Sequence, residues 1–205
     1  MELTYGRYLK VEELLQLQQP LSEGPEHDEM LFIIIHQVYE LWFKQILHEL
    51  EKLKSSFQEG ERGKALHTLK RIRSILKVLV SQLDVLETMT PLEFLSFRER
   101  LQSASGFQSC QFRELEFTLG LKNPKHLEHY PQGSEERNRL EKKIEEPSLW
   151  EVFLQFLSSL GHDSPKLKEG GRSIEPPDSS EDIQDLLEKI YRNHPDSALV
   201  CEMLT

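Results

Sequence analysis

Residues Met30–Leu50 read MLFIIIHQVYELWFKQILHEL, a stretch that predicts one long helix, apolar on nearly every side. In its central part the clearly polar side chains are His36, Gln37 and Glu40. Two apolar stripes recur at helical spacing: Leu31, Ile34, Ile35, Val38, Leu41 and Trp42 form the first, and Phe32, His36, Tyr39 and Phe43 form the second. A helix that is apolar on both faces is buried on both faces. The stretch therefore predicts an all-α protein built around this helix.

His36 is the unusual residue of this helix. A buried imidazole needs a partner for each ring nitrogen, or a ligand that supplies one. The residues alone leave two alternatives open: a core helix with a satisfied histidine, or the wall of an apolar pocket.

Bulk properties narrow the class of protein. A length of 205 residues suits a single domain, 1–205. The net charge of −10 argues against a nucleic-acid partner, which requires clustered Lys and Arg. Cys110 and Cys201 belong to no zinc or disulfide pattern. No secretion signal and no apolar run of about 20 residues occurs, so we expect a soluble, cytoplasmic protein without membrane spans.

Periodicity and helix-end signals predict helices throughout the chain. The expected ranges are 11–19, 28–57, 64–88, 91–101, 107–119, 134–145, 148–160 and 181–192, and residues 197–204 look like the first turns of a further helix. Asp28 is the expected N-cap of the central helix, and Ser148 with Glu151 forms a capping box. The segment 164–180 is expected to be a loop.

Short motifs of metal or hydrolase chemistry are missing. His48 and Glu49 begin an H-E-x-x-H pattern, but Lys52 occupies the place of its second histidine. Neither the E-x-x-H pair of di-iron bundles nor G-x-S-x-G occurs. We therefore assign no metal ligand, although a non-covalent heme or a substrate pocket leaves no short regular motif.

Longer blocks of the sequence resemble the tryptophan 2,3-dioxygenase family. They are TYGRYLKVEELLQLQQPLS from Thr4, HDEMLFIIIHQVYELWFKQILHEL from His27, LETMTPLEFLSFR from Leu86 and SGFQSCQFRELE from Ser105. These blocks lie in the family's order and cover most of residues 4–116. The resemblance implies an all-α bundle of the tryptophan/indoleamine dioxygenase type and a homotetramer. It also implies heme b as cofactor, with L-tryptophan and O₂ as substrates and N-formyl-L-kynurenine as product.

The resemblance also implies roles for individual residues. His36 would lie over the distal face of the heme and meet the indole N–H, a bond that a neutral imidazole can accept. Arg98 would pair with the substrate carboxylate, which its planar guanidinium suits. The substrate-pocket wall would consist of Phe32, Ile33, Ile34, Ile35 and Phe94. Ser105 and Gly106 would approach the heme edge, and Tyr5, Tyr8 and Leu9 would reach over the site of a neighbouring subunit.

One expected part of the family is not found in this sequence. The family's proximal heme histidine lies in C-terminal helices beyond Thr205, and His194 is followed by Pro195, which disfavours a buried ligand helix there. We therefore assign no axial ligand and expect the fold to be C-terminally incomplete. The chain as it stands is expected to have no defined heme coordination and no dioxygenase activity. A fragment, a disrupted reading frame and a short relative without heme remain open, the last as a helical module that binds an indole or a partner protein.

Overall fold

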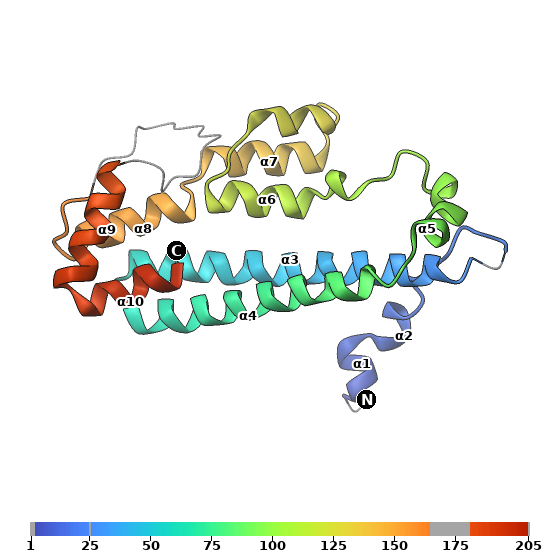
Figure 1. Cartoon of the computed structure of the whole chain (residues 1–205), viewed down its shortest axis with the longest axis horizontal. Coiled ribbons are helices and arrows are strands. Elements are labelled where there is room, and N and C mark those ends of the chain that lie inside the picture. Colours follow the sequence, from blue (N-terminus) through green and yellow to red (C-terminus); the bar gives the residue numbers. More distant parts are fainter. Residues whose placement is uncertain (1–2, 25, 165–180, 205) are drawn as a thin grey trace.

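Two long helices lie side by side along the length of the molecule (Figure 1). The computed structural model describes residues 3–24, 26–164 and 181–204. Helix α3 spans Asp28–Gln58 and α4 spans Arg62–Leu86. Gly60 lies in the reversal between them with a φ of +72°, a conformation that glycine adopts without steric cost.

All secondary structure in the described residues is helical, which confirms the all-α prediction. The remaining elements are α1 (Tyr5–Leu9), α2 (Val11–Leu14), α5 (Pro91–Arg98), η1 (Glu99–Leu101), η2 (Gly106–Gln108), α6 (Cys110–Leu119), η3 (Pro124–His129), α7 (Glu135–Glu145), α8 (Leu149–Ser159), α9 (Glu181–Asn193) and α10 (Pro195–Leu204). Within the described part of the chain, no helix is long and apolar enough to cross a membrane.

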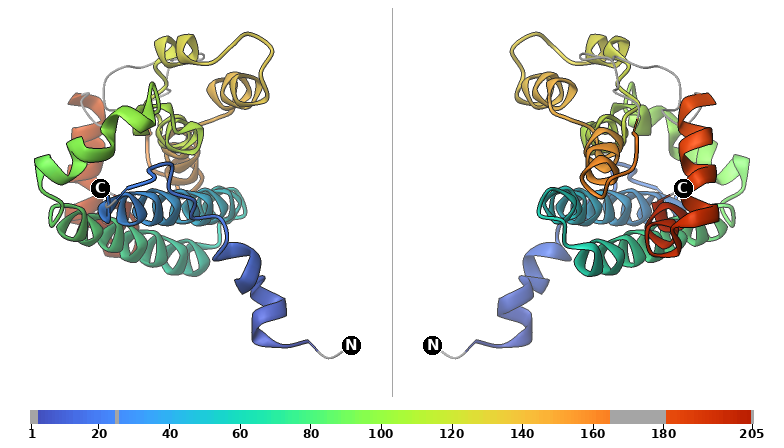
Figure 2. Two further views of the ribbon diagram at one scale, coloured as in Figure 1. Left: turned by 90° about the vertical axis from the view of Figure 1, so that its right-hand side faces the viewer. Right: turned by 90° about the vertical axis from the view of Figure 1, so that its left-hand side faces the viewer.

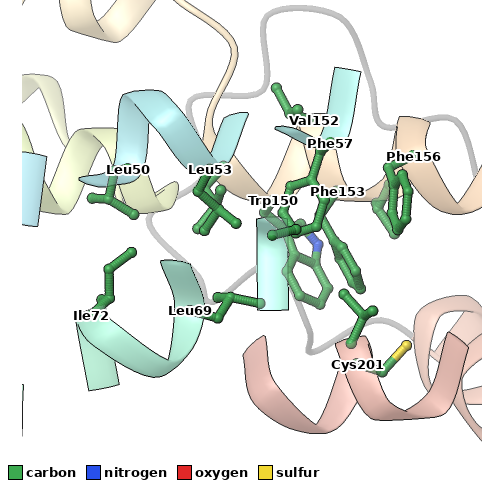
Figure 3. Packing of buried hydrophobic residues seen from close by; sticks show 14 of the residues in the cluster. Leu50, Leu53, Phe57, Leu69, Ile72, Trp150, Val152, Phe153, Phe156 and Cys201 are labelled. Atoms are coloured by element: carbon green, nitrogen blue, oxygen red, sulfur yellow. The ribbon is translucent and has the colours of Figure 1, made fainter. Parts of the chain in front are cut away.

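The main hydrophobic core lies at one end of the α3–α4 pair, where α8, α9 and α10 pack against it (Figures 1 and 3). Phe57 of α3 meets Phe153 of α8 with ring centroids 5.5 Å apart. Val200 and Cys201 of α10 are fully buried in the same core. Tertiary packing therefore stabilises α10, a helix of 10 residues that would be marginal in isolation.

A smaller core joins α6 to α7 and η3. Its buried members are Phe117, Tyr130 and Leu140. The Tyr130 hydroxyl donates to the carbonyl of Gln108, 3.2 Å away. This contact links the end of η3 to η2, just before α6. The connection 123–133 therefore packs against α6 and α7 through Tyr130.

Most helix ends agree with the sequence signals. Glu151 N–H donates to Ser148 Oγ (3.2 Å) and Ser148 N–H donates to Glu151 Oε2 (2.6 Å), which confirms the capping box. The predicted N-cap of the central helix was wrong. Asp28 is the first helical residue, and the N-cap is His27. The buried carboxylate of Glu29 accepts the N–H groups of Leu21 and Ser22 and so ties the preceding segment to the start of α3.

Two predicted helices are shorter in the structure than expected. The helix expected over 11–19 is α2, which ends at Leu14, and Lys10, with a φ of +51°, separates it from α1, which was not predicted. Ser109 is extended and separates η2 from α6, where its hydroxyl accepts Phe112 N–H. In both places the local backbone conformation overrides the apolar periodicity. The loop expected over 164–180 lies outside the described residues from 165 onward.

The N-terminal segment extends away from the bundle (Figure 2). Neither α1 nor α2 contains a buried residue. Tyr5, Tyr8 and Leu15 are about 70% exposed or more, at 78%, 72% and 69%. We refer to residues 3–15 as the N-terminal arm. Its apolar side chains are not covered by the described residues of this chain.

Candidate functional site: an apolar cavity beside His36

A cavity of about 570 Å³ opens between α3, α4, η2 and α6. Its volume falls within the roughly 300–1,000 Å³ typical of small-molecule sites. The apolar lining consists of Ile35, Tyr39, Phe43, Leu76, Leu79, Val80, Leu83, Leu86, Phe107, Phe112 and Leu115. The polar lining consists of His36, Glu40, Ser105, Gly106, Ser109 and Arg113. The cavity adjoins the main core, because Leu79 and Leu115 belong both to that core and to the cavity wall.

His36 lies in the cavity wall with one ring nitrogen already used. Its Nδ1 is 2.7 Å from the carbonyl oxygen of Phe32, one helical turn earlier. Because a carbonyl only accepts, Nδ1 must carry the proton of this bond. In the neutral ring, Nε2 is then an acceptor. The helix backbone therefore sets the tautomer, and His36 can accept an N–H from a ligand.

Phe32 lies next to His36 and Phe94 lies next to Phe32, although neither phenylalanine lines the cavity. The Phe32 ring is 4.1 Å from the imidazole and 5.8 Å from the Phe94 ring. Phe97, which is fully buried, contacts both phenylalanines at 5.6 and 5.5 Å. This aromatic cluster fixes α5 against the first half of α3 and supports His36 from behind.

Arg98 lies elsewhere. Its side chain is half-buried, and Nη1 donates to the carbonyl oxygen of Gln102, 3.0 Å away. Gln102 itself has a φ of +50°, which is uncommon for a residue other than glycine. Arg98 is not among the residues that line the cavity with His36. Instead it holds the start of the loop that leads to Ser105.

Ser105 and Gly106 do line the cavity. The Ser105 hydroxyl accepts Phe107 N–H at 3.3 Å and caps η2. A Cβ at Gly106 would meet no atom within 4 Å, so the space beside it is open to a bound group.

The isoleucine run divides between two sides of α3. Ile35 is buried and lines the cavity, whereas Ile33 is half-buried and Ile34 is 42% exposed. Tyr5, Tyr8 and Leu9 belong to the exposed N-terminal arm and do not line this chain's cavity. Helical geometry accounts for the division, because adjacent residues point about 100° apart.

Four lining residues with polar groups were not identified from the sequence: Tyr39, Glu40, Ser109 and Arg113. Tyr39 donates its hydroxyl to the Leu79 carbonyl at 2.6 Å, which ties α3 to α4. Gln111 donates to the Glu40 carboxylate at 2.8 Å and so holds it at the wall. Arg113 lines the cavity from α6. Tyr39 lies on the same stripe as His36, so the sequence contained a signal for its place in the cavity wall. The places of Glu40 and Arg113 depend on how α6 packs against α3, which the sequence does not show.

No cluster of three or more potential metal-ligating side chains occurs among the residues the structure describes. The cavity lining contains a single histidine, His36. Most of the other lining side chains are apolar, and the charged ones are Glu40 and Arg113. The arrangement suits a flat, largely apolar ligand that carries a few polar groups.

Comparison with known proteins places these features in a family. The family model described as tryptophan 2,3-dioxygenase matches residues 1–192. The chain is 51% identical over 202 residues to a tryptophan 2,3-dioxygenase of Herpetosiphon aurantiacus, covering 98% of this chain and 77% of that protein. It is 50% identical over 201 residues to one of Anaeromyxobacter sp. (strain K), covering 98% and 74% of the two chains. A protein of the same name from Xanthomonas oryzae pv. oryzae (strain PXO99A) is 42% identical over 191 residues, covering 93% and 64%. The chain therefore belongs to the tryptophan 2,3-dioxygenase family.

Proposed function

We propose that this protein is a heme-dependent dioxygenase that acts on L-tryptophan. The reaction inserts both atoms of O₂ across the indole C2–C3 bond and gives N-formyl-L-kynurenine, the first step of tryptophan catabolism through kynurenine. Membership of an enzyme family supports this over a heme-free binding module. The observation that carries the proposal is His36, whose Nε2 is left as a hydrogen-bond acceptor in an apolar cavity.

The cavity fits a porphyrin in chemistry. Its wall is formed by aliphatic and aromatic side chains from α3, α4, η2 and α6, and the open space beside Gly106 allows close approach of a planar ring. When bound, heme supplies the oxygen chemistry that amino-acid side chains cannot. Among the described residues, the apolar wall of the cavity would hold the ring, and His36 is reserved for the substrate.

The chain's own residues would then bind and orient the substrate. His36 accepts the indole N–H, and the Phe32–Phe94 cluster keeps its imidazole in place. Ile33, Ile34 and Ile35 belong to the proposed pocket wall, with Ile35 already facing the cavity. Apolar side chains exclude water from the indole. Orientation of this kind can account for several kcal/mol of a reaction barrier, about 7–11 in the best cases.

Arg98 is proposed to bind the substrate carboxylate. To do so, its guanidinium must exchange the Gln102 carbonyl for the substrate. Because Gln102 begins the loop that carries Ser105 and Gly106, this exchange would couple substrate binding to the position of that loop. A guanidinium–carboxylate pair, in which both partners are charged and two parallel bonds form, is stronger than one bond to a neutral carbonyl, which favours the exchange.

The assembly completes the proposal. We infer a cytoplasmic homotetramer of single-domain chains, residues 1–205, in which Tyr5, Tyr8 and Leu9 reach the site of a neighbouring subunit. The exposed, apolar N-terminal arm supports this role, because large exposed apolar patches commonly mark interfaces.

Binding and turnover test the function separately. Purified protein is titrated with protoporphyrin IX and with L-tryptophan, and binding at the cavity is checked by competition and by His36→Ala. Wild-type protein that binds neither compound would overturn the proposal. In a second assay with hemin, reductant and labelled O₂, N-formyl-L-kynurenine carrying two labelled oxygens supports the reaction directly. Such turnover would also refute the expectation that the chain lacks an axial ligand, whereas binding without turnover would support it.

A further inference from the structure

Arg113 is the buried cation of the cavity wall. It lies on α6, lines the cavity and is 6% exposed. Its guanidinium carbon lies 5.2 Å from the centre of the Phe112 ring, which also lines the cavity. Among the described lining residues it is the only arginine or lysine, and Glu40 is the only carboxylate.

The hydrogen-bonding capacity of Arg113 is only partly used. Nη1 donates to Glu116 Oε2, one helical turn along α6. The Nε–H group is buried and has no hydrogen-bond partner in the protein. Guanidinium has five N–H donors, and a buried donor without a partner is costly. An anion bound in the cavity could accept a hydrogen bond from this unpaired donor.

The charges around the cavity favour a carboxylate as that anion. Glu40 is already held by Gln111, whose Nε2 donates to both its carboxylate and its backbone carbonyl, at 2.8 and 3.0 Å. Among the described residues, Arg113 forms its ion pair with Glu116 and none with Glu40. Arginine binds carboxylates through parallel, charge-assisted hydrogen bonds.

We propose that Arg113 binds a carboxylate group of the cavity's ligand, an inference that rests on the proposed function. Two ligands of that function carry the group: the porphyrin, through its propionates, and L-tryptophan, through its α-carboxylate. Arg98 is the residue assigned to the amino acid, and it does not line the cavity. Arg113 is thus placed to recognise the ligand that enters the cavity itself.

Paired ligands test this directly. Protoporphyrin IX is compared with its dimethyl ester, and L-tryptophan with L-tryptophanamide, so that each pair differs in the carboxylate. The dissociation constant of each is measured for wild-type protein, for Arg113→Gln and for Arg113→Lys. Arg113→Gln should weaken binding of one acid by roughly tenfold or more and leave its neutral partner unchanged. Arg113→Lys keeps the charge and should lose less.

A matched control is available on the other side of α6. Arg139 of α7 pairs with Glu114 of α6 at 3.0 Å and does not line the cavity. Like Arg113→Gln, Arg139→Gln removes an ion pair between an arginine and a glutamate of α6. It should leave all four dissociation constants unchanged. Binding of the neutral ligands also reports whether each variant keeps an intact cavity.

The outcomes separate the two proposals. A selective loss for protoporphyrin IX assigns Arg113 to a propionate, and a selective loss for L-tryptophan assigns it to the amino acid. If Arg113→Gln protein binds each acid as tightly as wild-type protein does, the inference is overturned and the proposed function still stands. Parallel loss of acid and neutral ligand in both Arg113 variants would also overturn it, because the role would then be structural. Wild-type protein that binds neither acid would overturn the proposed function as well.

Discussion

Replacing Glu29 by glutamine should loosen the root of the N-terminal arm and lower the free energy of unfolding. The Glu29 carboxylate is 1% exposed and accepts two backbone N–H groups, from Leu21 at 2.7 Å and from Ser22 at 3.0 Å. Gln37 supports the same segment by donating to the Leu17 carbonyl at 3.0 Å. These contacts attach residues 17–22 to the first turns of α3, and the N-terminal arm lies just before these residues in the chain.

The magnitude follows from the bonds that are lost. Glutamine keeps the volume and one acceptor oxygen, but its amide NH₂ then faces a backbone N–H. One charge-assisted hydrogen bond is lost, which contributes about 1.5–3 kcal/mol. We expect Glu29→Gln to lower the unfolding free energy by about that amount at pH 7. Glu23→Gln is the control, since Glu23 is exposed in the same loop and should change stability by less than about 0.5 kcal/mol.

The effect should depend on pH in a defined direction. Burial alone would raise the pKa of Glu29, but the hydrogen bonds from Ser22 and Leu21 outweigh it and lower the pKa below its ordinary value. A lowered folded-state pKa stabilises the protein above the unfolded-state pKa of about 4.3, and this stabilisation is lost as pH falls through the folded-state value. The difference between wild-type and Glu29→Gln protein should therefore be constant near pH 7 and shrink in acid.

Urea denaturation between pH 3 and pH 7 measures this difference. Limited proteolysis of the arm gives a second, local readout, because a loosened root should expose residues 17–22 to cleavage. A Glu29→Gln variant as stable as wild type at pH 7, or a difference that grows in acid, would refute the reasoning.

Three further predictions concern the cavity, the core and the thiols. His36→Ala should reduce the preference for L-tryptophan over 1-methyl-L-tryptophan by roughly two- to tenfold, the value of one hydrogen bond, as measured by the ratio of dissociation constants; an unchanged ratio would remove His36 from indole recognition. Phe153→Ala should lower the unfolding free energy by about 3–5 kcal/mol in urea denaturation, because Phe153 is fully buried between Phe57 and Trp150; a loss below about 1 kcal/mol would contradict this packing. Burial raises the pKa of Cys201 to about 11, so iodoacetamide at pH 8 should label Cys110 well before Cys201 in folded protein and both equally in urea; mass spectrometry showing early labelling of Cys201 would refute this.

The helices and their ends were largely predictable because they depend on local physics. Gly60, Pro91 and Ser148 mark helix ends through backbone conformation and capping, which involve residues close in sequence. The apolar stripes of Met30–Leu50 predicted a helix, which is confirmed, but burial on both faces was wrong. Ile46 and Leu50 lie in the main core, whereas Ile34 and Leu41 of the first stripe are 42% and 53% exposed. The break at Lys10 was not predictable in this way, because a left-handed residue other than glycine has no strong sequence signature.

Residues 30–50 and the later sequence blocks determined by themselves that this is a helical protein of the tryptophan 2,3-dioxygenase family, and they identified His36, Ser105 and Gly106. Only the tertiary structure decided which side chains share one cavity. Tyr39, Glu40 and Arg113 join His36 there because α4 and α6 pack against α3, whereas Arg98 turns to Gln102. The physical reason is distance along the chain: helical periodicity fixes which face a residue lies on, but not which face of another helix it meets.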